Sequence, residues 1–168
     1  SSDLPTIASG ASVSTPNAVG GGRRWLQVSV GTSHACGLGT DGSVLCWGAG
    51  ADGRLGTGTT ADSTEPIAVS GGRTWATVAV GAASTCAISP DNDAYCWGAN
   101  DSGQLGDAST ITRLVPTLVG GNGWPTLAAG GGHTCGAAFA NLAGAIAKCW
   151  GYNSDGQLGD GTNTSRSE

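Results

Sequence analysis

Short apolar runs separated by turn-forming residues set the pattern of this chain and predict β-strands rather than helices. No apolar run is longer than a few residues, and Gly, Pro, Asp and Ser stand between the runs. In the segment 13–62 the pattern predicts four short strands, a tight turn before the last strand and a Gly-rich loop after it. The strands are expected at Asn17–Val19, Trp25–Val30, His34–Leu38 and Val44–Trp47, the turn at Thr40–Ser43 and the loop at Gly50–Gly58.

The same pattern recurs three times, with a period of about 50 residues. Four short strands in a unit of this length are typical of a β-propeller blade. The expected fold class is therefore all-β, with three blades of four antiparallel strands. The predicted units are 13–62, 63–112 and 113–162, with 1–12 as a linker or part of an adjoining blade and 163–168 as the start of a further repeat or a tail. Repeated positions include Trp25, Trp75 and Trp124; Pro16, Pro66 and Pro116; and the C-W-G elements at 46–48, 96–98 and 149–151.

Composition agrees with strands and turns and removes several classes of function. Gly makes up 31 of the 168 residues, and each Gly inside a helix costs about 1 kcal/mol, so long helices are not expected. No stretch is long and apolar enough for a transmembrane helix. The net charge is −5 and the few cations are scattered, whereas binding to nucleic acid needs clustered cations. Neither nucleic acid nor membrane insertion is therefore expected.

The six cysteines carry the clearest chemistry of the sequence. Cys36 and Cys46 are placed symmetrically about residue 41, at the centre of the predicted hairpin turn. Residues directly opposite each other in such a hairpin have Cα atoms about 4.5 Å apart, which is within the range of a disulfide. The other two predicted disulfides are Cys86–Cys96 and Cys135–Cys149, the latter with a longer loop within Asn141–Ala145.

Three disulfides imply an oxidising compartment, so the protein is expected to be extracellular, at the cell surface or associated with the wall. Buried free thiols are the alternative. A metal site is not expected, because the spacing lacks C-x-x-C pairs. Two N-x-[ST] sequons, at Asn100 and Asn163, are compatible with a secreted glycoprotein, with unmodified asparagine as the alternative.

No set of residues predicts catalysis, a cofactor or a metal. His34 and His133 occupy one repeat position, which is Ser84 in the second unit; a residue that recurs with the fold period is expected to bond to a neighbouring strand. The loop carboxylates lack the spacing of a calcium loop and are expected to form Asx-turns. The six Trp are expected to pack between blades, an exposed platform for sugars being the alternative. The loop carboxylates are Asp52, Asp101, Asp107, Asp155 and Asp160.

The order W-x-x-V-x-x-G, H-x-C, C-W-G and G-x-L-G-x-G resembles the repeat of the regulator of chromosome condensation (RCC1) family. The resemblance covers about 150 of the 168 residues. Members of this family close a ring of six or seven blades, and three blades fall below the number that propellers use. The resemblance therefore implies that further blades, from the same longer polypeptide or from another chain, complete the propeller.

The resemblance implies functions of three kinds. The predicted disulfides favour the first, an extracellular, non-enzymatic binding or structural module that recognises a protein or polysaccharide partner or forms part of a surface or wall assembly. In this it is similar to the Cys-bearing ectodomains of plant receptor kinases. The alternatives are guanine-nucleotide exchange on a small GTPase and secreted inhibition of a hydrolase. Paired cysteines argue against exchange, which takes place in a reducing compartment.

Overall fold

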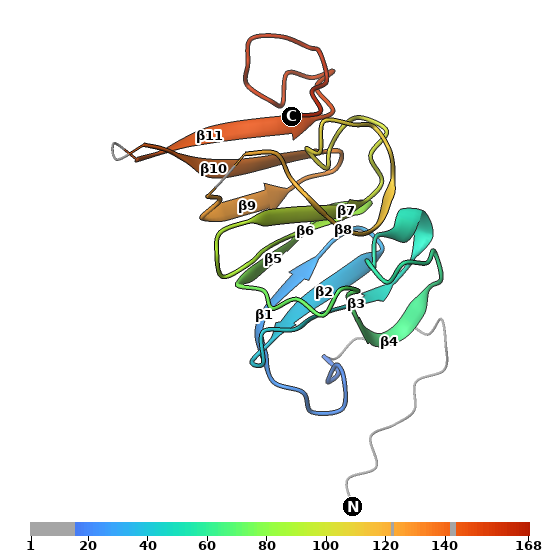
Figure 1. Cartoon of the computed structure of the whole chain (residues 1–168). Coiled ribbons are helices and arrows are strands. Elements are labelled where there is room, and N and C mark those ends of the chain that lie inside the picture. Colours follow the sequence, from blue (N-terminus) through green and yellow to red (C-terminus); the bar gives the residue numbers. More distant parts are fainter. Residues whose placement is uncertain (1–15, 122, 142–143) are drawn as a thin grey trace, which may run out of the picture.

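The chain forms three antiparallel β-sheets stacked in sequence order (Figure 1). The computed structural model describes residues 16–121, 123–141 and 144–168, so the predicted linker at 1–12 lies outside the described residues. Among the described residues the only helical element is the three-residue 3-10 turn η1, Ala51–Gly53. The strands are β1 (Trp25–Val30), β2 (His34–Gly39), β3 (Val44–Gly48), β4 (Ser63–Ala68), β5 (Thr77–Val80), β6 (Ser84–Ile88), β7 (Ala94–Gly98), β8 (Arg113–Leu118), β9 (Thr126–Ala129), β10 (His133–Asn141) and β11 (Gly144–Gly151).

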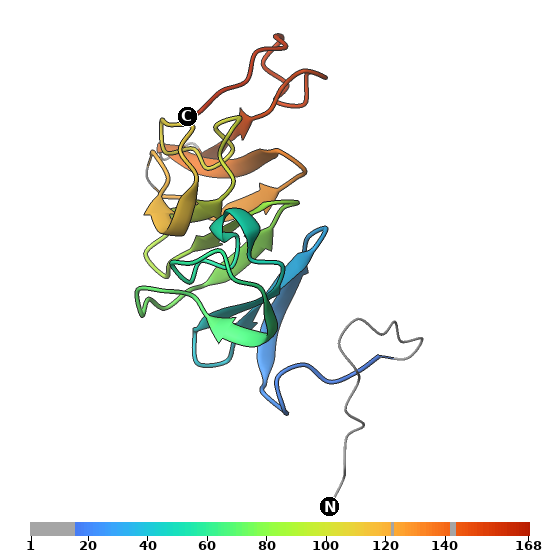
Figure 2. The same cartoon turned by 90° about the vertical axis from the view of Figure 1, so that its right-hand side faces the viewer.

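Each sheet is a meander, as the blade pattern predicts. The first two sheets have the strand orders β1-β2-β3-β4 and β5-β6-β7-β8, and the third has the order β9-β10-β11. In the third sheet an isolated bridge joins Gly151 to Arg166. It occupies the position at which Gly48 and Ser63 pair in the first sheet. Figure 2, turned by 90°, shows the same stacking from the side, and β5 lies against both β1 and β9.

A disulfide joins the two central strands of every sheet. Cys36 lies directly opposite Cys46 in the β2–β3 register, with a Cα–Cα distance of 4.0 Å. The same pairing is found in the other two sheets, where the Cα–Cα distance is 4.1 Å in each. The bridged pairs are those expected from the sequence: Cys36–Cys46, Cys86–Cys96 and Cys135–Cys149.

The position of the fourth strand differs from the prediction. Asn17–Val19 forms no strand, and the strand that contains Pro66 is the outer strand of the first sheet, not the first strand of the second. The strand around Pro116 closes the second sheet in the same way. Proline has no N–H to donate, so it is tolerated at a sheet edge, where only one side of the strand is paired.

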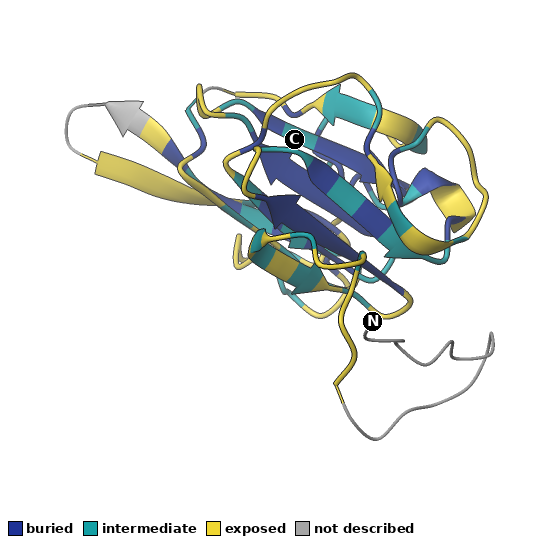
Figure 3. Ribbon diagram, turned by 90° about the horizontal axis from the view of Figure 1, so that it is seen from below, coloured by how far each residue is buried: buried dark blue, intermediate teal, exposed yellow. Residues whose placement is uncertain are grey.

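The core lies between the sheets. Figure 3 shows buried residues concentrated in the central strands and exposed residues at the rims. The Trp residues anchor both interfaces, and Trp75, Trp97, Trp124 and Trp150 are at most 4% exposed. Other buried residues between the first and second sheets include Leu38, Val44, Leu55, Val69, Val78 and Val80, and those between the second and third include Ile88, Ala94, Leu105 and Val119.

Candidate functional site: the loops at the blade ends

Three equivalent loops leave the sheets after the C-W-G strands, and each carries exposed side chains. We call them the blade-end loops: residues 49–62, 99–112 and 152–165. They follow β3, β7 and β11, which end on the same side of the molecule in Figure 1. Connecting loops held by a rigid sheet are where binding residues are commonly found in β-proteins.

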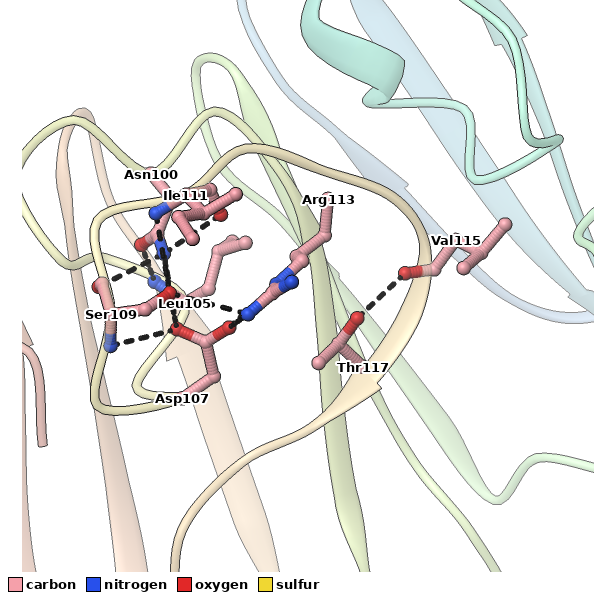
Figure 4. A network of polar contacts seen from close by, with 8 residues as sticks. All are labelled: Asn100, Leu105, Asp107, Ser109, Ile111, Arg113, Val115 and Thr117. Atoms are coloured by element: carbon pink, nitrogen blue, oxygen red, sulfur yellow. Dashed lines mark hydrogen bonds and ion pairs between the residues drawn. The ribbon is translucent and has the colours of Figure 1, made fainter.

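A buried asparagine organises the second blade-end loop (Figure 4). The side chain of Asn100 is fully buried, and its Nδ2 donates to the carbonyl oxygens of Ser109 and Ile111 at 3.0 and 3.1 Å. Its Oδ1 accepts the backbone N–H of Leu105 at 2.9 Å. One amide thus ties together three points of a loop that has no regular structure to satisfy its backbone.

Asp107 closes the same loop from the other side. Its carboxylate accepts the N–H of Ser109 at 3.1 Å, which is an Asx-turn, and pairs with the guanidinium of Arg113 at 2.7 Å. Burial raises the pKa of Asp107, but the hydrogen bonds from Ser109, Arg113 and Asn100 and the charge of Arg113 outweigh it and lower the pKa overall. The carboxylate is therefore ionised at neutral pH and serves the loop itself.

The third loop repeats this network, whereas the first loop is held by a different set of hydrogen bonds. Asn153 is fully buried and takes the place of Asn100, with Asp160 and Arg166 in the places of Asp107 and Arg113. In the first loop the equivalent position is Gly50, whose N–H donates to Asp62 at 2.8 Å. A side chain has no room at Gly50, because a Cβ atom there would meet a backbone oxygen at 1.9 Å.

These frames hold a set of exposed side chains of mixed chemistry. In the second loop Ile111 is 60% exposed, although its own carbonyl is fixed by Asn100. In the first loop Asp52 is exposed and pairs with Arg54 at 2.7 Å. Because the backbone beneath is fixed, a contact to these side chains does not require the loop itself to become ordered. Exposed positions of the three loops include Asp52, Thr59, Asp101, Thr110, Ile111, Ser154, Asp155 and Asn163.

The first two loops also join neighbouring sheets through single carbonyl groups. The carbonyl oxygen of Arg54 accepts the hydroxyl of Thr85 at 2.9 Å and the indole N–H of Trp97 at 3.0 Å. The carbonyl of Gln104 accepts from Thr134 and Trp150 in the same way, at 2.9 and 3.1 Å. The second and third sheets thus each donate a hydroxyl and an indole N–H to the loop of the sheet before them.

His34 extends this contact, and it is not placed for catalysis. Because the Thr85 hydroxyl donates to Arg54, the Nε2–H of His34 donates to Thr85 Oγ1, at 2.8 Å. Thr85 is fully buried, so this pairing of an imidazole with a hydroxyl is closed to substrates. The hydrogen bond to the neighbouring sheet is the role expected from the sequence. Burial, with a smaller effect of the Arg54 charge, lowers the pKa of His34 from 6.5 to about 4.

We expect this histidine to make the fold less stable in mild acid. A His whose pKa is lowered on folding stabilises the folded state fully above pH 6.5, and this contribution is lost as the pH falls toward 4. Between pH 7 and pH 5 the free energy of unfolding should fall by about 2 kcal/mol from this residue. Urea unfolding at several pH values, compared with His34→Ser, measures it. The variant carries the serine of the second unit, and its stability should be nearly flat over this interval.

The titration of the carboxylates does not obscure that test. Hydrogen bonds from Ser43 lower the pKa of Asp41 to about 2, and hydrogen bonds from Thr162 lower that of Asp160 to about 2. Both groups therefore stay ionised between pH 7 and pH 5. An unchanged pH dependence in His34→Ser would show that another group is responsible.

The two sequons lie in different surroundings. The structure corrects the expectation for Asn100, because its Nδ2, the atom to which a glycan would attach, is buried and donates to loop carbonyls. Asn163 is exposed, with its Nδ2 donating to the carbonyl of Ser154 at 3.0 Å. Its modification stays a prediction.

The other candidate residues have structural roles in the fold. Asp107 and Asp160 form the expected Asx-turns, at 3.1 and 2.9 Å to the N–H two residues on. Asp52 instead pairs with Arg54. Four of the six Trp are buried between sheets, which supports the packing role over a sugar platform.

In the part of the chain that the structure describes, no three His, Cys, Asp or Glu side chains are grouped to hold a metal ion. Within the same residues no helix is long and apolar enough to cross a membrane.

Comparisons with known proteins identify the family of these repeats. The family described as "Regulator of chromosome condensation (RCC1) repeat" matches residues 41–88 and 91–137, and a second family of the same description matches 25–54 and 75–104. No curated protein matches the chain.

Solved structures share the arrangement of the sheets. Human WBSCR16 aligns with a TM-score of 0.74 at 26% identity over 86% of this chain and 36% of its own. Prp20p, the RCC1 of Saccharomyces cerevisiae, aligns with a TM-score of 0.73 at 21% identity, over 86% of this chain and 37% of its own. The ectodomain of the Arabidopsis thaliana receptor kinase ACR4 gives a TM-score of 0.52 at 24% identity, over 81% of this chain and 43% of its own. The chain thus spans little more than a third of the length of the first two.

Proposed function

Because this chain belongs to the RCC1 repeat family, we propose that it is a non-enzymatic binding module that works outside the reducing cytosol. Its partner is a protein or a polysaccharide, met by the blade-end loops, and further blades come from the same polypeptide or another chain. The propeller fold supports a binding module, since it offers loops on a rigid frame. The observation that carries the proposed location is the disulfide in every sheet.

The disulfides support an oxidising location because they are repeated structural parts. Each joins directly opposite residues of the two central strands, and the cysteines of the first two sheets are fully buried. Thiol pairs in a cytosolic protein are usually kept reduced, unless they are catalytic or redox-sensing. Buried, repeated pairs of this kind fit neither of those roles.

The blade-end loops support binding because their shape is set before a partner arrives. Asn100 and Asn153 fix the backbone of two loops from within. The exposed residues above these anchors include hydroxyl, carboxylate and apolar side chains. A preformed surface of this kind avoids much of the entropy cost of binding.

Nucleotide exchange is the principal competing function. Yeast Prp20p, which shares this arrangement of sheets, has binding properties toward Gsp1p and histones. That property belongs to Prp20p, which is 21% identical over the aligned region, and fold alone does not carry an activity from one protein to another. An oxidised protein outside the cytosol would not meet a GTPase, so the state of the cysteines separates the two functions.

The first experiment therefore counts thiols in the protein from its natural source. The protein is denatured without reductant, alkylated and weighed as an intact chain, and a second sample is reduced before alkylation. We expect no alkylated cysteine in the first sample and six in the second, since the structure has no free cysteine. Six alkylated cysteines without reduction would contradict the proposal and would favour nucleotide exchange as the function.

The binding surface is tested separately with a loop variant. Ile111→Asp places a charge on an exposed side chain without disturbing the carbonyl that Asn100 holds. Arrays of polysaccharides and of secreted proteins are screened with the wild type, and each hit is repeated with this variant. Leu26→Asp, also at an exposed apolar position but on β1, is the matched control. We expect the loop variant to weaken binding at least tenfold; equal effects of both variants would contradict the assignment to the loops.

A further inference from the structure

The first strand of each sheet has an edge that no strand of its own sheet covers. In the first interface, two side chains of β1 bind this edge of β5. The carboxamide of Gln27 donates from Nε2 to the carbonyl of Val78 at 2.8 Å, and its Oε1 accepts the N–H of Val78 at 3.1 Å and the hydroxyl of Thr77 at 3.0 Å. The hydroxyl oxygen of Ser29 accepts the N–H of Val80 at 3.0 Å. The edge of β5 thus receives a carboxamide and, two residues further, an acceptor.

The edge of β9 presents the same groups in the second interface. The N–H of Gly130 donates to the carbonyl of His133 at 2.8 Å, and hydrogen-bonded and non-hydrogen-bonded pairs alternate from there along the strand. Ala129 and Leu127 therefore fall in non-hydrogen-bonded pairs with β10, and their N–H and C=O groups point to the free edge. Thr126 supplies a hydroxyl directly before Leu127, in the order found on β5.

The side chains that bind this edge in the first interface have no counterparts in the second. Gln27 and Thr77 occupy the same register position in their sheets, as do Ser29 and Ala79. The hydroxyl of Thr77 is engaged with Gln27, and alanine has no polar side-chain atom. Among the described residues no side chain forms a hydrogen bond with the main chain of Leu127. The receiving groups are thus repeated, whereas the carboxamide that they receive is missing.

The edge of β9 is open to a group from outside. A shallow cavity of about 270 Å³ lies over it, where β1, β5 and β9 run side by side (Figure 1). The cavity is lined by residues of these three strands, and none of them is charged. Leu127 and Ala129 are half-buried, and Thr126 is exposed. The receiving groups all belong to β9, opposite Thr77 and Ala79 of β5, so the site lies inside the described array of sheets.

We propose that the free edge of β9 binds the primary carboxamide of a glutamine side chain carried by another polypeptide. The nitrogen of the carboxamide donates to the carbonyl of Leu127, and its oxygen accepts the N–H of Leu127 and the hydroxyl of Thr126. An acceptor two residues further in the ligand, such as a serine hydroxyl, takes the N–H of Ala129. A glutamate side chain does not fit, because a carboxylate has no hydrogen to donate to the carbonyl. The site is separate from the blade-end loops and does not depend on the partner proposed for them.

Hydrogen exchange tests whether the edge is free. We expect the N–H of Leu127 to be protected at least tenfold less than the N–H of Val78, which is bonded to a side chain. The double variant Thr77→Gln/Ala79→Ser gives the second sheet both residues of the first, and it should raise the protection of Leu127 and Ala129 toward that of Val78. Equal protection of Leu127 and Val78 in the wild type would overturn the proposal.

Binding is measured with the blocked tripeptide acetyl-Gln-Val-Ser-amide, which repeats residues 27–29 of this chain. It is followed by the amide signals of Leu127 and Ala129 in two-dimensional ¹H–¹⁵N spectra. We expect both signals to shift saturably, and acetyl-Glu-Val-Ser-amide to bind at least fivefold more weakly. Equal binding of the two peptides would show that their main chain, not the carboxamide, makes the contact, and it would overturn the proposal, as would the absence of a saturable shift.

Two variants of the protein complete the test. Thr77→Gln/Ala79→Ser should weaken the binding of the glutamine peptide at least tenfold, because side chains of the protein then fill the site. Thr110→Gln places the same side chain at an exposed threonine of the second blade-end loop and is the matched control. It should bind the peptide as the wild type does. Unchanged binding by the double variant, or an equal loss in both variants, would contradict the assignment to the edge of β9.

Discussion

Replacing the Cys86–Cys96 disulfide with two alanines is expected to lower the free energy of unfolding by at least about 3 kcal/mol. Closing a loop of this length restricts the unfolded chain by about that amount. Both cysteines are fully buried between the sheets, so the substitution also removes packed sulfur atoms from the core. Urea unfolding of Cys86→Ala/Cys96→Ala against the wild type, without reductant, measures the loss.

The disulfide of the third sheet is the matched control. Cys135 and Cys149 close a loop of similar length, with a sequence separation of 14 against 10, but both are partly exposed. The chain-entropy effect is therefore nearly equal, whereas the packing effect is smaller. We expect Cys135→Ala/Cys149→Ala to be less destabilising than the change in the second sheet. A loss below about 1 kcal/mol in both variants would show that the bridges contribute little to the fold.

Asn100→Ala is expected to destabilise the protein by a similar amount, about 3 kcal/mol. The change removes the partner of the Leu105 N–H and of the Ser109 and Ile111 carbonyls. Each buried polar group left without a partner costs about 1–3 kcal/mol, and part of that cost is recovered if water enters the loop. Thermal or urea unfolding measures the loss, and hydrogen exchange at Leu105 reports whether the loop itself opens.

Two further variants test whether the effect of Asn100 comes from its buried hydrogen bonds and not from its place in a sequon. Asn163→Ala removes the exposed asparagine of the other sequon and should change stability by less than about 0.5 kcal/mol. Asn100→Asp keeps the acceptor for Leu105 but replaces the donor with an oxygen facing two carbonyl groups and Asp107. It should be at least as destabilising as alanine. Equal, small effects of Asn100→Ala and Asn163→Ala would contradict the anchoring role of Asn100.

The sequence predicts the inner part of each blade well because the signals there are local. The strand Trp25–Val30 has the predicted bounds, and the cysteines of each hairpin face each other as their symmetry about the turn requires. The register of a hairpin is set by the type and length of its turn, so nearby residues contain the information.

The sequence pattern assigns the outer strand to the wrong sheet, because a repeat has a period but no natural starting point. Pro66 recurs at a fixed interval, yet the spacing does not say whether its strand pairs with the sheet before it or after it. The structure pairs Ile67 with Cys46 of the first sheet. The long loop that connects them, residues 49–62, makes this pairing non-local.

The contacts within the blade-end loops cannot be predicted from the sequence for a similar reason. The triplet Asn100-Asp101-Ser102 has the form of a sequon, whereas the environment of Asn100 depends on residues as far away as Ile111. His34 and Thr85 are 51 positions apart in the chain, and they come into contact only because two sheets pack together. The one available signal is the repetition of the Asn at 100 and 153 with an Asp seven residues later.

The contacts between sheets have a consequence for how such a chain can diversify. The acceptor that receives Thr85 and Trp97 is a main-chain oxygen, so these two hydrogen bonds do not depend on which residue supplies it. The chain uses this freedom: the residue is Arg54 in one loop and Gln104 in the next. A duplicated unit can therefore change the residue at that position and keep the same two hydrogen bonds to its neighbour. Copies of one unit can thus diverge in sequence there without losing the contact that stacks them.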